Sequence, residues 1–194
     1  MTRTTHTAIA AAFVVLAATL ASACNNDKQP NGSAPTTAAP VTGSSSAAPT
    51  SAAPQSREQA SQAAIDAYVG MQRAFLKATE SADPAYPDLA KYASGEALTR
   101  LTGALKDYQA KGLRGRGDVA FHPSIESLAP ADAPTKAQVR DCMDTSKTSL
   151  YKANGDPYQD EPGGLRLVRA DVERIDGAWK VTGFGVHGVG SCTV

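Results

Sequence analysis

The sequence predicts an α+β domain in which N-terminal helices pack on a curved antiparallel sheet. Apolar residues recur with helical spacing between Ser56 and Gly112, and they alternate as in strands between Val119 and Val181. The pair Asp176-Gly177 marks a tight hairpin turn, because these residues tolerate the positive φ that such a turn needs. Helices followed by consecutive strands favour an α+β arrangement with the helices on one face of the sheet.

The helical part divides into three segments. Ser56–Gln59 reads Ser-Arg-Glu-Gln, a capping box that opens a helix, and Asp83-Pro84 ends that segment. A short helix is expected from Pro87 to Tyr92, and Ser94 is expected to cap a third helix that Gly112 ends. The residues expected to face the core are Ile65, Tyr68, Val69, Phe75, Leu76, Leu98, Leu101, Leu105 and Tyr108.

Four strands are expected after a glycine-rich turn at Arg114-Gly115-Arg116, whose two basic side chains we expect to be solvated. In the first strand, Pro123 indicates an edge or a bulge. The last strand is rich in glycine, which weakens a strand and often marks a bend or the close approach of another group. The residues that share a phase are Val119, Phe121 and Ile125, then Ala137, Val139 and Met143, then Val168, Ala170 and Val172, and finally Trp179 and Val181.

The N-terminus has the features of an export signal. Arg3 precedes an apolar run, Ala8–Ala21, that is shorter than the roughly 20 residues needed to cross a bilayer as a helix. Small residues and then Cys24 follow, and this end resembles the lipobox of bacterial lipoproteins, although Ala21 stands where the lipobox usually has leucine. The resemblance implies that residues 1–23 are removed and that Cys24 carries a diacylglycerol with its palmitate-like chains.

An ordinary secretory signal is the alternative, because it also ends in small residues. If Cys24 is lipidated, the protein is held on the outer leaflet of the cell membrane, since two acyl chains anchor stably. Residues 24–55 are rich in Ala, Pro, Ser and Thr and are expected to form a disordered linker of the cell envelope, open to O-linked sugars. The folded domain is then expected to span residues 56–194.

The other two cysteines, Cys142 and Cys192, are expected to form a disulfide. An exported protein meets an oxidising compartment in which disulfides persist. The alternative, a metal ligand or a nucleophile, has little support, because no CxxC occurs and no histidine lies at ligand spacing from either cysteine.

Charge and motifs exclude several functions. The formal net charge is +0, so no basic excess favours binding to nucleic acid. No phosphate-binding loop, dinucleotide fingerprint, HExxH or GxSxG motif occurs, so no metal or cofactor is expected.

The order and length of the elements from Ser56 to Val194, the Trp-x-Val of the closing hairpin and the paired cysteines resemble a known fold family. This is the cone-shaped nuclear-transport-factor-two-like fold, which SnoaL-like proteins and small lipoproteins of high-GC Gram-positive bacteria share. The resemblance implies an apolar pocket between the sheet and the long helix. It also implies that some members are isomerases or dehydratases and that many are non-catalytic modules.

Asp141 is the main candidate for chemistry. It keeps phase with Val139 and Met143, so it should point toward the core, and a carboxylate in an apolar site can act as a general base. His122 and His187 are candidate acid–base partners of Asp141. His187 keeps phase with Trp179 and Val181, which places it on the same nominal face. The alternative is that Asp141 and both histidines are structural.

Three functions remain open at this stage. The first, which we favour, is a membrane-tethered, non-catalytic module that binds a small apolar ligand or an envelope protein. The second is a SnoaL-like isomerase or lyase that uses Asp141. The third is a structural role in assembly.

Overall fold

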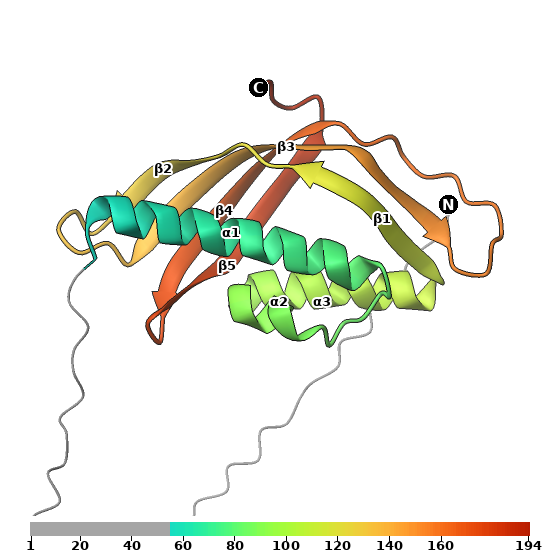
Figure 1. Ribbon diagram of the computed structural model, residues 1–194, viewed down its shortest axis with the longest axis horizontal. Helices are drawn as coiled ribbons and strands as arrows, with labels where there is room; N and C mark the ends of the chain where they lie inside the picture. Colours follow the sequence, from blue (N-terminus) through green and yellow to red (C-terminus); the bar gives the residue numbers. More distant parts are fainter. Residues whose placement is uncertain (1–54) are drawn as a thin grey trace, which may run out of the picture. The chain divides into compact units, whose positions relative to one another are not determined.

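The computed structural model describes residues 55–194. In this part of the chain, three helices lie on one side of a curved antiparallel sheet, and the sheet arches over them (Figure 1). The predicted α+β class and the position of the helices are therefore confirmed. The predictions for the signal peptide (1–23), Cys24 and most of the linker (24–55) lie outside the described residues.

Helix α1, Arg57–Thr79, begins with the predicted capping box. The Ser56 hydroxyl accepts a hydrogen bond from the Gln59 amide at 3.2 Å, and the Gln59 side chain accepts one from the Ser56 amide at 3.0 Å. The buried stripe differs from the predicted one, because of the five large residues expected there only Tyr68 is fully buried. The rest of the stripe is mostly small; its members are Ala60, Ala64, Ala67, Met71, Gln72, Ala74, Ala78 and Thr79. Small side chains allow the sheet to approach the helix closely.

Helices α2, Pro87–Tyr92, and α3, Gly95–Ala110, follow as predicted. Gly112, with φ 64°, takes the left-handed conformation that ends α3. The prediction for Ser94 is wrong in one respect, since its side chain makes no capping hydrogen bond. Instead its backbone N–H donates to the Val181 carbonyl at 2.9 Å, which fixes the start of α3 to the sheet.

The sheet is built around the long strand β3, Lys136–Lys152. Strands β1, Leu113–Ala120, and β2, Pro123–Ala129, both pair with β3 along the same edge, one after the other. On its other side β3 pairs with β4, Leu165–Ile175, and β4 pairs with β5, Ala178–Val189. All of these pairings are antiparallel.

The strand predicted around Pro123 lies at the edge of the sheet and is interrupted there, as Pro123 indicated, but it forms two strands rather than one. It is broken at Phe121 and His122 into β1 and β2. Arg114-Gly115-Arg116 is also not a turn but part of β1, which starts at Leu113. Gly115 is needed in this strand because Thr79 of α1 packs directly on its Cα.

The β4–β5 hairpin has the predicted turn, with positive φ at both Asp176 (51°) and Gly177 (83°). The predicted alternation in β4 is confirmed, since Val168, Ala170 and Val172 are buried. Together with Ala137 and Val139 of β3, these residues form the sheet side of the core; the helix side is the alanine stripe with Tyr68, Met71, Leu101 and Leu105.

Candidate functional site

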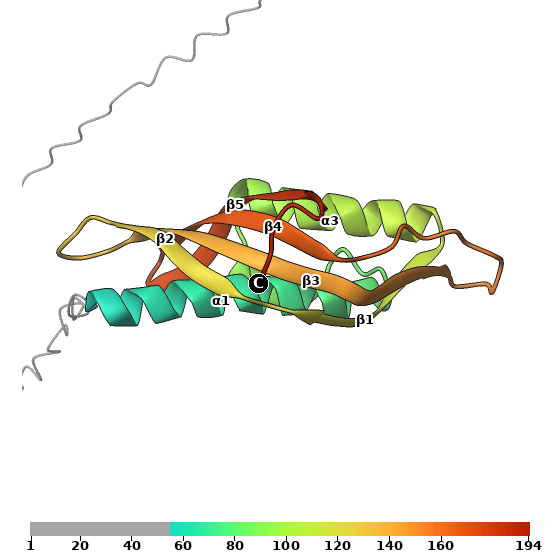
Figure 2. The ribbon, with the colours of Figure 1, turned by 90° about the horizontal axis from the view of Figure 1, so that it is seen from above.

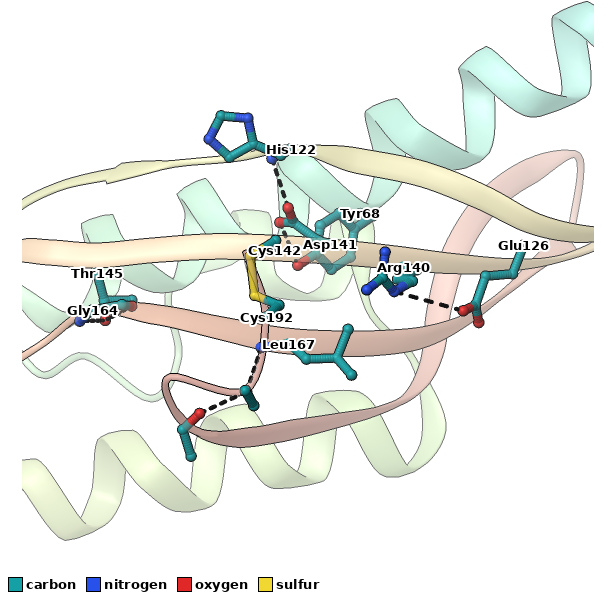
Figure 3. The surroundings of a disulfide bond; sticks show 12 residues. Tyr68, His122, Glu126, Arg140, Asp141, Cys142, Thr145, Gly164, Leu167 and Cys192 are labelled. Atoms are coloured by element: carbon teal, nitrogen blue, oxygen red, sulfur yellow. Dashed lines mark hydrogen bonds and ion pairs between the residues drawn. A yellow bond between two sulfur atoms is a disulfide. The ribbon is translucent and has the colours of Figure 1, made fainter. Parts of the chain in front are cut away.

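Asp141 lies in β3 and pairs with Pro123, the first residue of β2 after the break between β1 and β2. It points inward as expected and its exposed fraction is 0%. Its Oδ2 atom accepts a hydrogen bond from the Tyr68 hydroxyl at 2.9 Å, and its Oδ1 atom accepts one from the His122 backbone N–H at 2.6 Å (Figure 3). The Tyr68 hydroxyl in turn accepts a hydrogen bond from Gln72 Nε2 at 3.3 Å. Both carboxylate oxygens therefore have a protein donor.

Burial and hydrogen bonding act on this carboxyl in opposite directions. Burial raises the pKa of Asp141, because the ionised form loses solvation, and the hydrogen bonds from His122 and Tyr68 partly offset this by stabilising the charge. Burial and the nearby carboxylate also raise the pKa of Tyr68, so its hydroxyl stays protonated and donates to Asp141. The arrangement is a buried carboxylate fixed by two donors.

Neither histidine brings its ring to Asp141 in the described structure. His122 contributes its backbone amide, and its ring points away from the carboxylate (Figure 3). The prediction that His187 lies on the face of Asp141 is wrong. Val172 pairs with Val181 but Asp171 pairs with Gly183, so Thr182 is an extra residue that reverses the alternation of β5. His187 is therefore exposed on the opposite, outer face of the sheet.

The predicted disulfide between Cys142 and Cys192 is present, with the two Cα atoms 5.8 Å apart. Cys142 follows Asp141 and so points to the outer face, where the C-terminal tail crosses β4 to reach it (Figures 2 and 3). The Ser191 hydroxyl accepts a hydrogen bond from the Leu167 amide at 2.8 Å and donates one to the Gly188 carbonyl at 2.6 Å. These bonds hold the tail against β4 and β5.

The outer face of the sheet carries no helix in the described structure (Figure 2). Several ion pairs lie across this face. The Glu126 carboxylate forms an ion pair with Arg169 Nε at 3.3 Å and a longer one with Arg140 Nε at 4.0 Å. Lys136 pairs with Glu173 at 3.2 Å. These pairs connect β2, β3 and β4 across the face.

Two hollows of about 370 Å³ and 350 Å³ lie on this face beside the charged residues. Glu96, Gln138, Asp171 and Gly183 line both hollows, so the two meet there; we call them together the outer-face groove. Sequence reasoning missed this groove. The one signal for it was the glycine content of β5, because Glu96 and Asp171 look like ordinary surface residues in the sequence.

Two further hollows, of about 440 Å³ and 190 Å³, lie against the exposed side of α1, with Arg73 and Lys77 lining both. Asp141 lines none of these four hollows. Within residues 55–194, no helix is long and apolar enough to cross a membrane. The same residues contain no group of three or more His, Cys, Asp or Glu side chains that could hold a metal ion.

Comparison with known proteins gives similarity of fold alone. No protein-family model matches the chain, and no curated protein matches it. Among solved structures, the chain is similar to the intermembrane space region of the chloroplast protein ARC6, with 18% identity over 65% of this chain and 95% of that chain and a TM-score of 0.49. It is also similar to an NTF-2 like protein of unknown function from Shewanella oneidensis MR-1, with 15% identity over 63% and 97% of the two chains and a TM-score of 0.38.

A third similar structure is a putative scytalone dehydratase from Novosphingobium aromaticivorans DSM 12444. Its identity is 15% over 63% of this chain and 81% of that chain, with a TM-score of 0.41. The NTF-2 like protein belongs by name to the fold family that the sequence layout resembles. At these identities and TM-scores, none of the three assigns an activity to this chain.

Proposed function

We propose that this protein is a lipid-anchored envelope protein whose folded part, residues 56–194, is a non-catalytic module that binds a partner protein. The anchor is supported by the sequence, in which small residues and Cys24 follow a short apolar run after Arg3. The disulfide between Cys142 and Cys192 agrees with export, because disulfides persist in oxidising compartments.

The state of Asp141 carries the argument against catalysis. A general base must come within hydrogen-bond reach of a substrate proton. Both oxygens of Asp141 are instead occupied by the Tyr68 hydroxyl and the His122 amide, and the side chain is fully buried. This geometry supports a structural role for the residue that was the best candidate for an isomerase or lyase.

The surface supports binding of a protein rather than of a small apolar ligand. The described hollows lie on the exterior and are lined by charged side chains such as Glu96, Lys136 and Asp171, whereas small-ligand sites are mostly apolar. The outer face of the sheet is broad and carries no helix in the described structure, so a partner has access to it.

The anchor is tested by a Cys24→Ser exchange in the full chain, expressed in a bacterium that processes lipoproteins. We expect the wild-type protein to incorporate an alkyne-labelled palmitate and to enter the detergent phase on Triton X-114 partitioning. The Cys24→Ser variant should lose the label and enter the aqueous phase, because it has no acyl chains. An Asn26→Ser exchange, two residues away, is the matched control and should behave like the wild type.

Two results would contradict the anchor. One is a wild-type protein that takes up no label and is recovered from the medium, which would identify an ordinary secretory signal. The other is a Cys24→Ser variant that still enters the detergent phase, since the membrane association would then have another source.

A further inference from the structure

We draw no further inference here: the strongest candidate, the outer edge of β5 beyond Val181, where no further strand pairs within residues 55–194 and Val186 and Val189 are 44% and 52% exposed, carries nothing because nothing in the structure shows what covers it.

Discussion

Asp141 shows how one buried side chain can close a gap in a sheet. The edge strand is interrupted at Phe121 and His122, where strand pairing with β3 cannot continue. A backbone N–H that loses its partner away from water destabilises a fold. At this break, the Asp141 carboxylate supplies the partner, because it accepts a hydrogen bond from the His122 amide. Its second oxygen holds Tyr68 of α1, so the same carboxylate joins β3, the edge strand and the long helix.

The pH dependence of stability tests this description through an Asp141→Asn exchange. Burial raises the pKa of Asp141, so between the ordinary Asp pKa of roughly 3.9 and the raised value the folded state holds a proton that the unfolded state has released. The free energy of unfolding should therefore fall as pH rises through this interval and then level off. The asparagine variant should lack this fall, because asparagine does not titrate.

Urea denaturation of both proteins at several pH values between 4 and 8 measures the effect. The exposed carboxyls of Glu58 and Asp144, whose pKa values are lowered, titrate equally in both proteins and cancel in the difference. Parallel pH profiles for the two proteins would show that Asp141 has the same pKa folded and unfolded.

Only part of this site could be predicted from the sequence. Alternation with Val139 and Met143 was enough to place Asp141 toward the core, because a strand has a period of two. Its partners could not be found in this way. Tyr68 lies 73 positions earlier in the chain. Pro123 indicated an irregularity of the edge strand, but no local pattern indicates that the break turns the His122 amide toward Asp141.

At the level of the elements, the residues that start helix α1 and form the β4–β5 turn were predicted correctly. The face of the sheet to which each strand residue points was predicted less well. The capping box at Ser56 and the turn at Asp176-Gly177 depend on a few adjacent residues, and both were confirmed. The orientation of His187 depends on the extra residue Thr182, since a bulge reverses every later side chain. The buried stripe of α1 also differed, because the sheet packs on small residues and leaves Phe75 and Leu76 partly exposed.

Two glycine-to-alanine exchanges should have opposite effects on stability. A Cβ on Gly115 of β1 would overlap with Thr79 Oγ1 and would lie 2.8 Å from Thr79 Cβ, so Gly115→Ala forces β1 and α1 apart. We expect this exchange to lower the free energy of unfolding by about 1–3 kcal/mol. Gly103 of α3 is exposed and nothing lies near its Cβ position, so Gly103→Ala should raise the free energy by about 1 kcal/mol.

Urea denaturation at neutral pH measures both exchanges. A neutral or stabilising result for Gly115→Ala would mean that α1 and β1 are not in close contact. A destabilising result for Gly103→Ala would mean that this part of α3 is not an exposed, regular helix.

At the level of the whole domain, two adjacent residues of β3 fasten the sheet from both faces. Asp141 holds α1 on the inner face through Tyr68, and Cys142 holds the C-terminal tail on the outer face through Cys192 (Figure 3). The order of helices and strands was enough to predict the layers. Helical spacing predicted Tyr68 in the core, but it could not predict that Met71 and a stripe of alanines would fill the interior beside it, or that the charged hollows would lie on the outer face.

The disulfide is expected to be the largest single contribution to the stability of this domain. Cys142 and Cys192 are separated by 50 positions, and closing a loop of that length is worth about 4 kcal/mol in the chain-entropy model, with measured values commonly about 2–4 kcal/mol. We expect the double variant Cys142→Ser, Cys192→Ser to lose about this much free energy of unfolding. Because the tail is then released, the Leu167 amide should also become less protected from hydrogen exchange.

Thermal unfolding with and without a reducing agent provides the control within one protein. Reduced wild type should unfold at the same temperature as the double variant, and oxidised wild type at a higher one. Since the rest of the sheet, from β1 to β5, keeps its hydrogen bonds without the tail, the variant should still fold. A wild-type unfolding temperature that reductant leaves unchanged, together with two reactive thiols in the unreduced protein, would contradict a structural disulfide at this position.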